Sequence, residues 1–336
     1  MAVALNRRRA IAISAAAVGS ALLPFGGNGA AQAEVVTWRG QALGAPASLT
    51  INHPDRSQAL RLVESVAAEV RRLERIFSLY REDSDLVSLN RHRIRISPPP
   101  ELIEVLQICR SFWELSAGAF DPTIQPLWAT YQSHFSERDA DPNGPPARSL
   151  SAALAKVGFD GVLFNADRIE FDRPGMALTL NGIAQGYITD RVVAVLRAGG
   201  IGSCLVNMGE SHAVGRRPDG QGWRIGIDDP RQAGRSLQVL ELVDRAEATS
   251  SPYGFQFDQH GRFNHLLDAR SGRPTCRYES VTVVAPAAVT ADGLSTALSM
   301  MDPESITGAV QGLEGIEVYL RQASGEQVAI GSQQSR

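Results

Sequence analysis

Apolar side chains recur at three- and four-residue spacing over residues 58–77. That period puts them on one side of a helix, so the stretch predicts a helix with one buried face. The recurring positions are Leu60, Val63, Val66, Ala67, Val70, Leu73 and Phe77. Ahead of it, residues 35–52 mix apolar and turn residues and predict an opening pair of strands.

Proline and glycine divide the rest of the chain into shorter elements. Pro98, Pro99 and Pro100 break the chain before helical spacing resumes over 101–116, and 136–148 predicts a loop. Beyond it we expect a hairpin over 168–180 around Pro174-Gly175, a helix over 183–198 ended by Gly199-Gly200, strands at 203–206, 223–227, 237–242 and 281–284, and a final helix from about Ala291. No repeat and no regular strand–helix alternation is present, so the pattern predicts an α+β fold. We expect one large domain with mixed or antiparallel sheets and flanking helices.

The N-terminal segment has the pattern of an export signal. Arg7, Arg8 and Arg9 precede a stretch without charge over 10–23, and Ala31-Gln32-Ala33 offers a cleavage site. The adjacent arginines favour the twin-arginine route; an ordinary secretory signal or an uncleaved anchor is the alternative. We therefore expect residues 1–33 to be a signal peptide, 34–336 to form the exported domain, and the location to be periplasmic. No second long apolar segment follows, so no transmembrane segment is expected in the mature chain.

Charge and cysteine content narrow the class further. The chain carries 33 basic and 36 acidic residues; without the three arginines of the signal, 30 and 36 remain, a net charge of −6. That balance argues against nucleic acid as a partner, because phosphate contacts need a basic face. The sequence has three cysteines and no C-x-x-C spacing, which argues against a disulfide framework.

Glycine, small polar and acidic residues gather in four clusters. They are Ser78-Leu79-Tyr80 with Ser84-Asp85-Leu86 and Asn90; Gly118-Ala119-Phe120-Asp121-Pro122-Thr123; 180–187 with Asp190 and Asn207-Met208-Gly209-Glu210; and 248–251 with 264–268, Ser271-Gly272-Arg273-Pro274 and 291–297. In this order and at these spacings, from about Leu43 to Asp302, the clusters resemble the ApbE family of FAD:protein FMN transferases. The resemblance implies an ApbE-like fold over 34–336, with FAD as substrate.

The resemblance also implies the reaction. FMN would pass from FAD to a serine or threonine hydroxyl of an acceptor protein, releasing AMP and depending on Mg²⁺. The acceptor would belong to a membrane redox complex. An exported member is similar to NosX-type proteins of nitrous oxide respiration, which points to a NosR-like flavoprotein. Two alternatives remain: a Mg²⁺-dependent FAD pyrophosphatase, and a non-catalytic periplasmic protein that binds or delivers flavin.

Cleaving a pyrophosphate calls for charge neutralisation, which a hard cation with oxygen ligands supplies. Ser295 and Thr296 follow Asp292 by three and four residues, so on a helix they share its face. The family resemblance places Mg²⁺ on Asp292, Ser295 and Thr296 and on the backbone of Gly182. The alternative for Asp292 is a helix-start residue stabilised by the helix dipole.

His265 is the expected general base, because histidine titrates near neutrality and this one lies in the family's block 264–268. A structural histidine is the alternative. The family's FAD contacts correspond to Tyr80, Ala119, Phe120, Asp121, Thr179, Gln185 and Leu266. Tyr80 would lie against the flavin ring, Asp121 would accept from adenosine or ribose, and Leu266 would act through its backbone. Asp121 could instead be a turn-former before Pro122. Thr179 and Gln185 are neutral where relatives commonly carry charge, which motivates the binding-protein alternative.

Overall fold

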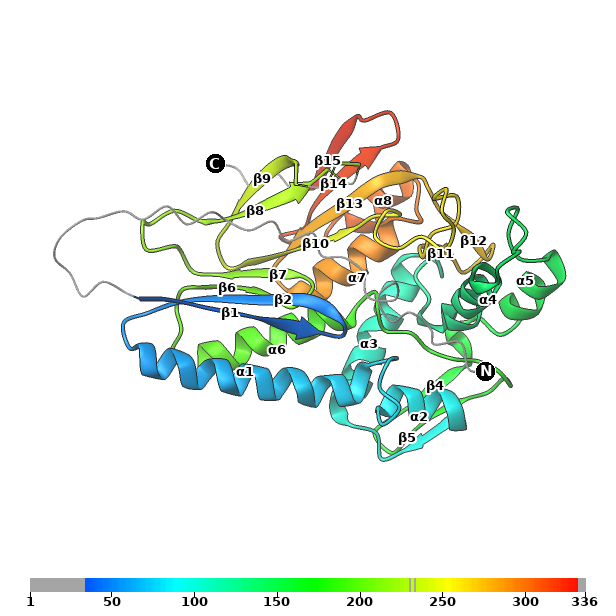
Figure 1. Cartoon of the computed structure of the whole chain (residues 1–336), viewed down its shortest axis with the longest axis horizontal. Helices are drawn as coiled ribbons and strands as arrows, with labels where there is room; N and C mark the ends of the chain where they lie inside the picture. The colour runs from blue at the N-terminus through cyan, green and yellow to red at the C-terminus, as the bar shows by residue number, and fades with distance from the viewer. Residues whose placement is uncertain (1–33, 230, 233, 332–336) are drawn as a thin grey trace.

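The computed structural model describes residues 34–229, 231–232 and 234–331. At its centre lies an eight-stranded sheet in the order β1-β2-β6-β7-β10-β13-β14-β15 (Figure 1). Its strands are β1 (Glu34–Ala42), β2 (Ala45–His53), β6 (Cys204–Asn207), β7 (Ser211–Val214), β10 (Arg245–Ser250), β13 (Tyr278–Ala285), β14 (Glu317–Gln322) and β15 (Gln327–Gly331). Neighbouring strands are antiparallel throughout. The predicted α+β class with antiparallel sheets is confirmed.

Three helices cover one face of this sheet: α1 (Arg56–Phe77), α6 (Ala184–Ala198) and α7 (Ala288–Leu298). Figure 1 shows α1 and α6 running side by side along it. Helix α1 buries the stripe that includes Val66, Val70 and Leu73, as its sequence period predicts. Asp55 caps its start by accepting a hydrogen bond from the Gln58 N–H at 3.0 Å.

A separate hairpin lies on the opposite face. It consists of β8 (Trp223–Asp228) and β9 (Ser236–Leu242), which pair with each other. Trp223, Ile225 and Ile227 point inward and pack with Ala213 of β7 and Val284 of β13. The large sheet is therefore covered by helices on one side and only partly covered by the hairpin on the other. That leaves room for a cavity above its open strands.

Most of the remaining elements flank one end of the sheet, while α8 (Pro303–Val310) packs against β15. The flanking elements are α2 (Asp85–His92), β3 (Ile94–Ile96), α3 (Pro100–Leu115), η1 (Pro122–Ile124), α4 (Gln125–Ser136), α5 (Ala147–Leu154), η2 (Phe159–Gly161), β4 (Val162–Phe164), β5 (Arg168–Phe171), β11 (Leu267–Asp268) and β12 (Arg273–Pro274). An aromatic cluster formed by Trp128, Tyr131, Phe255, Phe257 and Phe263 ties α4 to the long loop after β10. Tyr131 also donates to the Gly272 carbonyl at 3.0 Å.

Two predicted elements are wrong. The hairpin over 168–180 does not form, because β5 pairs with β3 and β4 instead. The chain after β5 makes hydrogen bonds to a side chain and not to a second strand. The Asn90 side chain accepts from Leu178 N–H at 2.7 Å and donates to Leu178 C=O at 2.8 Å. The helix expected from Ala291 is α7, but it is not the final one. Helix α8 follows, capped by Asp302 through Ser305 N–H at 2.9 Å.

The predicted export signal, residues 1–33, lies outside the described residues. Within the described part, no helix combines the length and the apolar character needed to cross a membrane.

Candidate active site

One cavity of about 1350 Å³ opens between the sheet, the β8–β9 hairpin and the loops around α4. It brings together residues from all but the first of the four sequence clusters. The predicted site residues that line it are Ala119, Phe120, Asp121, Thr179, Gly182, Gln185, His265, Leu266, Asp292 and Thr296. Tyr80 and Ser295 are the predicted residues that do not. Tyr80 is 51% exposed, with its hydroxyl paired to the side chain of Asn181 at the cavity wall.

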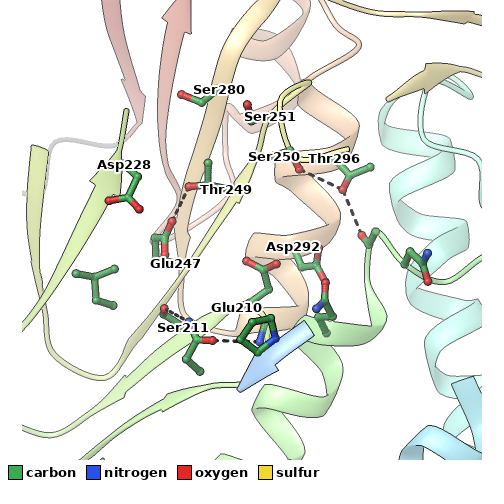
Figure 2. Close-up of a pocket in the computed structure, with 18 of the residues that line it drawn as sticks. Glu210, Ser211, Asp228, Glu247, Thr249, Ser250, Ser251, Ser280, Asp292 and Thr296 are labelled. Atoms are coloured by element: carbon green, nitrogen blue, oxygen red, sulfur yellow. Dashed lines mark hydrogen bonds between the residues drawn. The ribbon is translucent and has the colours of Figure 1, made fainter. Parts of the chain in front are cut away.

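Asp292 stands on α7 with its carboxylate at the cavity (Figure 2). One carboxylate oxygen, Oδ2, accepts the Gly186 N–H at 2.9 Å; within the described residues, no hydrogen bond to the other is recorded. Burial raises the pKa of this carboxyl to about 7. A carboxylate held out of water with an open oxygen is a strong ligand for a cation.

Two further oxygens lie beside Asp292. The Thr296 hydroxyl, on α7, donates at 3.4 Å to the carbonyl of Gly182, in the turn before α6, so the two oxygens are neighbours. Ser295 turns away from the cavity: its hydroxyl donates to the Asp292 carbonyl at 3.0 Å and lies 2.8 Å from Ser250 Oγ. The expected ligands that line the cavity are therefore Asp292, Thr296 and the Gly182 carbonyl. Ser295 supports them through Ser250, which lies 3.4 Å from Thr296 Oγ1.

This donor set suits a hard divalent cation. No group of three or more His, Cys, Asp or Glu side chains able to hold a metal occurs in the part of the chain that the structure describes. A carboxylate, a hydroxyl and a carbonyl are the mixed oxygen donors that Mg²⁺ takes, with positions left for phosphate oxygens. The close approach of the donors requires glycine, because a Cβ on Gly186 would lie 2.4 Å from the Ala288 carbonyl. The residues present therefore fit Mg²⁺.

Asp190, on α6, fixes the start of the helix that carries this set. Its carboxylate accepts from Ala288 N–H at 2.8 Å and Val289 N–H at 2.9 Å, the first N–H groups of α7. The residue before the helix, Ala287, provides no side-chain cap. His212 Nδ1 lies 2.9 Å from Asp190 Oδ1 and joins β7 to the same point. Asp190 thus serves as a cap supplied by a neighbouring helix.

Replacing Asp190 by alanine is expected to lower the free energy of unfolding by about 2 kcal/mol, because two buried N–H groups lose their acceptor. It should also weaken Mg²⁺ binding, since α7 presents Asp292 and Thr296. Urea unfolding and calorimetric Mg²⁺ titration measure the two effects. Asp55→Ala is the matched control: it removes the cap of α1 and should leave Mg²⁺ affinity unchanged. Equal Mg²⁺ affinity in Asp190→Ala and wild type would contradict this role.

His265 lies in the loop after β10 and lines the cavity. Its Nδ1 lies 3.1 Å from the Phe255 carbonyl, which can only accept, so Nδ1 carries the proton. In the neutral ring Nε2 is then an unprotonated acceptor. Burial lowers the pKa of His265 and outweighs the opposing effect of that carbonyl. The ring therefore stays neutral at pH 7, with a base at Nε2, as a general base requires.

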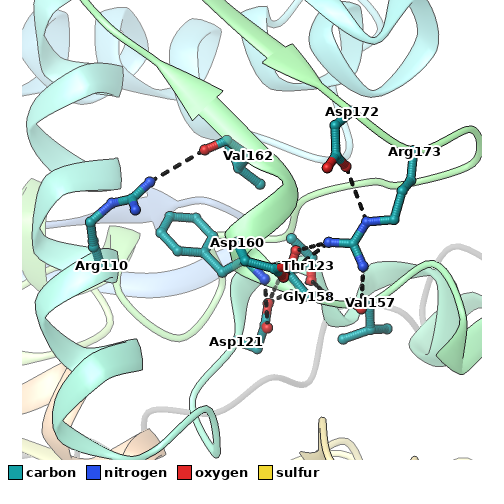
Figure 3. Close-up of polar contacts among 10 residues, drawn as sticks. Arg110, Asp121, Thr123, Val157, Gly158, Asp160, Val162, Asp172 and Arg173 are labelled. Atoms are coloured by element: carbon teal, nitrogen blue, oxygen red, sulfur yellow. Dashed lines mark hydrogen bonds and ion pairs between the residues drawn. The ribbon is translucent and has the colours of Figure 1, made fainter.

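Asp121 has a structural role that the sequence left open. Its Oδ1 accepts from the Thr123 N–H and hydroxyl at 2.8 and 2.5 Å, and its Oδ2 accepts from Phe159 N–H at 2.9 Å (Figure 3). Both oxygens are thus engaged within the protein, and Asp121 caps η1. The turn-forming alternative accounts for these contacts, while the position of Asp121 at the cavity leaves its expected contact with adenosine or ribose a prediction.

Leu266 and Thr179, two further expected flavin contacts, also line the cavity. The backbone N–H of Leu266 donates to Asn264 Oδ1 at 2.9 Å, and its carbonyl accepts from Thr275 N–H at 2.8 Å. The N–H is therefore engaged, while the carbonyl keeps a second lone pair for a further donor, so the expected backbone contact with FAD stays a prediction. Thr179 N–H donates to the Pro122 carbonyl at 2.8 Å, which joins the two expected FAD loops.

Four carboxylates that line the cavity were not among the predicted site residues: Glu210, Asp228, Asp229 and Glu247. Burial raises the pKa of Glu210 well above its usual range, and the nearby charge of Asp292 adds to the effect. Burial also raises the pKa of Glu247 to about 7, against the hydrogen bond from the Thr249 hydroxyl at 2.6 Å. An acidic residue inside a strand is unusual, and this was the available sequence signal for Glu247.

Glu247→Gln should make the fold less sensitive to pH. The raised pKa means that the wild-type carboxyl contributes its full stability below its ordinary pKa of 4.5 and loses it as the pH rises to about 7. Across that pH window, the free energy of unfolding of the variant should therefore rise by up to about 3 kcal/mol relative to that of the wild type. Thermal unfolding from pH 4 to 8 measures this, with Glu137→Gln as an exposed control. If the unfolding temperatures of Glu247→Gln and wild type changed in parallel with pH, the raised pKa of Glu247 would be contradicted.

The comparisons with known proteins agree with this site. The family model described as "ApbE family" matches residues 43–320. A FAD:protein FMN transferase of Vibrio cholerae is 33% identical over 233 residues, 68% of this chain and 69% of the relative. One of Escherichia coli K12 is 26% identical over 304 residues, 87% of this chain and 86% of the relative.

Solved structures agree as well. Flavin transferase ApbE from Vibrio cholerae superposes with a TM-score of 0.77 at 28% identity, covering 89% of this chain and 98% of that one. The apo form of Pseudomonas stutzeri flavinyl transferase ApbE gives 0.73 at 29% identity, covering 89% and 96%. The family model spans most of the chain, the relatives are aligned along most of their own length, and the structures share the fold. The chain belongs to the ApbE family.

Proposed function

We propose that this protein transfers FMN from FAD to a serine or threonine hydroxyl of an acceptor protein, in a Mg²⁺-dependent reaction that releases AMP. The observation that carries the proposal is the meeting, in one cavity, of the Asp292–Thr296–Gly182 oxygen set and the open Nε2 of His265. The named activity of the relatives, FAD:protein FMN transferase, supports it.

The residues divide the work of the reaction. The P–O bond between the FMN phosphate and AMP breaks, a P–O bond to the acceptor hydroxyl forms, and AMP leaves with the bridging oxygen. Asp292, Thr296 and the Gly182 carbonyl would hold Mg²⁺, which neutralises phosphate charge when bound. His265 Nε2 takes the hydroxyl proton. Ala119, Phe120, Thr179, Gln185 and Leu266 supply the wall against which FAD lies.

Mass spectrometry tests the reaction directly. The mature protein is mixed with FAD, Mg²⁺ and a candidate acceptor domain, and the acceptor should gain the mass of FMN less water while AMP appears. Release of FMN and AMP with an unmodified acceptor would favour the pyrophosphatase. FAD that is bound but never cleaved would favour the flavin-binding protein.

We further propose that the protein acts in the periplasm on a membrane redox subunit, with a NosR-like flavoprotein as the first acceptor to try. The arginines and apolar stretch of residues 7–23 support the location. Fusing residues 1–40 to a reporter that functions only after folded export tests it, and replacing Arg8 and Arg9 by lysine should block export by the twin-arginine route.

A further inference from the structure

The cavity is larger than one small-molecule site. Its volume of about 1350 Å³ exceeds the roughly 300–1,000 Å³ of a typical ligand pocket. The residues proposed for FAD and Mg²⁺ occupy the part near α4, α6 and α7. In Figure 2, Glu247 and Thr249 lie between Asp292 and Thr296 on one side and Asp228 of β8 on the other. The part beyond Glu247 has no role yet.

The floor of this second part is a row of polar side chains. Strand pairing sets Arg39 opposite Ser48, Ser48 opposite Asn207, Asn207 opposite Ser211, and Ser211 opposite Glu247. Partners in register project from the same face, and these five residues all line the cavity. The row crosses β1, β2, β6, β7 and β10. At about 4.8 Å between strands it is about 19 Å long, the length of about six residues of extended peptide.

Strand β8 forms the wall above this floor. Residues from both of its faces line the cavity, Trp223 and Ile225 from one, Arg224, Gly226 and Asp228 from the other. Both faces reach the cavity when a strand presents its edge to it. Within the described residues β8 pairs only with β9, so main-chain N–H and C=O groups on its other edge are open to single hydrogen bonds from a segment that crosses it.

Three arginines and three carboxylates line this end of the cavity: Arg39, Arg217 and Arg224 with Asp228, Asp229 and Glu247. Arg39 and Arg224 are exposed side chains at the cavity, and neither has a carboxylate partner within the described residues. Arg217 is already paired with Asp219 at 2.6 Å. Each carboxylate has a partner within the protein: Asp228 Oδ1 accepts from the Ser236 hydroxyl at 3.2 Å, Asp229 Oδ1 accepts from the Arg231 N–H at 3.0 Å, and Glu247 Oε1 accepts from the Thr249 hydroxyl at 2.6 Å. Arg39 and Arg224 therefore remain as exposed cations at this end of the cavity, available to a charged ligand.

We infer that this row of polar side chains is a track that binds the acceptor protein as an extended acidic segment, laid over Arg39, Ser48, Asn207 and Ser211 across the edge of β8, with acidic side chains on Arg39 and Arg224. The inference rests on the proposed transfer reaction. The track belongs to the same cavity as His265 and Asp292, so a hydroxyl at the inner end of the segment can reach the flavin phosphate.

Two fluorescein-labelled nine-residue peptides test the inference without FAD. Both carry a central threonine; one has two aspartates on each side of it, the other has asparagines there. Fluorescence anisotropy with the mature protein and Mg²⁺ should show at least about tenfold tighter binding of the aspartate peptide, a preference that weakens with salt. In the double variant Arg39→Ala/Arg224→Ala the preference should fall to threefold or less. Arg61→Ala removes an exposed arginine on α1, on the covered face of the sheet, and should keep it.

FAD affinity separates the possible occupants. If the double variant keeps wild-type FAD affinity while losing the aspartate preference, the track belongs to the acceptor. A parallel loss of FAD affinity would assign the arginines to the phosphates of FAD and overturn the inference. So would equal binding of the two peptides by the wild type, or a preference that survives in the double variant. Because these titrations involve no transfer, they fail or succeed independently of the FMN mass gain that tests the proposed function.

Discussion

Asp292→Asn is expected to reduce FMN transfer at least about 10³-fold, equivalent to about 4 kcal/mol of transition-state stabilisation. Asparagine keeps the shape of the side chain but cannot neutralise a cation. The wild-type carboxylate has one oxygen on Gly186 N–H and one open to the cavity, so the substitution should spare the first contact and remove the ligand. Mg²⁺ should raise the thermal unfolding temperature of the wild type and leave that of Asp292→Asn unchanged.

The same variant separates a metal ligand from a helix-start residue. If Asp292 only stabilised α7, Asp292→Asn would lower stability and leave the Mg²⁺ response intact. Asp302→Asn, at the cap of α8, serves as the control for such a structural loss. Retained transfer at more than about a tenth of the wild-type rate would remove Asp292 from the site.

Local sequence pattern predicted the elements whose buried face repeats over many turns. Helix α1 begins two residues before the predicted start, and α3 (Pro100–Leu115) is shifted by one residue from 101–116. A short helix such as α2, with eight residues, has too few turns for its apolar positions to show a helical repeat in the sequence. The small sheet was beyond reach for another reason. It pairs Ile94–Ile96 with Arg168–Phe171, and no local pattern reports a partner that distant.

Ten of the twelve site residues that the motifs predicted line the cavity, but the motifs did not predict what each polar atom binds. Asp121, Ser295 and the Leu266 backbone were expected to face ligands, and each is already paired within the protein. The choice depends on residues far along the chain, such as Phe159 for Asp121. The row of polar residues proposed to bind the acceptor could not be predicted for a similar reason. Arg39 and Glu247 lie more than 200 positions apart, and only the order of the strands puts them in one row.

His265→Ala should lower kcat for transfer by about 10²–10⁴-fold, the usual contribution of a general base, with FAD affinity little changed. The wild-type rate should be limited by this base, because the Phe255 carbonyl fixes the proton on Nδ1 and leaves Nε2 open. Since burial lowers the pKa of His265, the acid limb of kcat/KM should lie below its ordinary pKa of 6.5. Transfer is followed by the mass of the acceptor across pH 5–9.

Chemical rescue distinguishes this role from a structural one. Added imidazole can occupy the space left by His265→Ala and accept the hydroxyl proton, so it should restore part of the transfer with a pH dependence set by its own pKa. A histidine that only held the loop through Phe255 would give a variant with weakened FAD binding and no response to imidazole. His260→Ala, an exposed histidine in the same loop, should behave as wild type. FAD cleavage that persists in His265→Ala while acceptor modification stops would show that the base activates the acceptor hydroxyl, because breaking the pyrophosphate then needs only the cation and water.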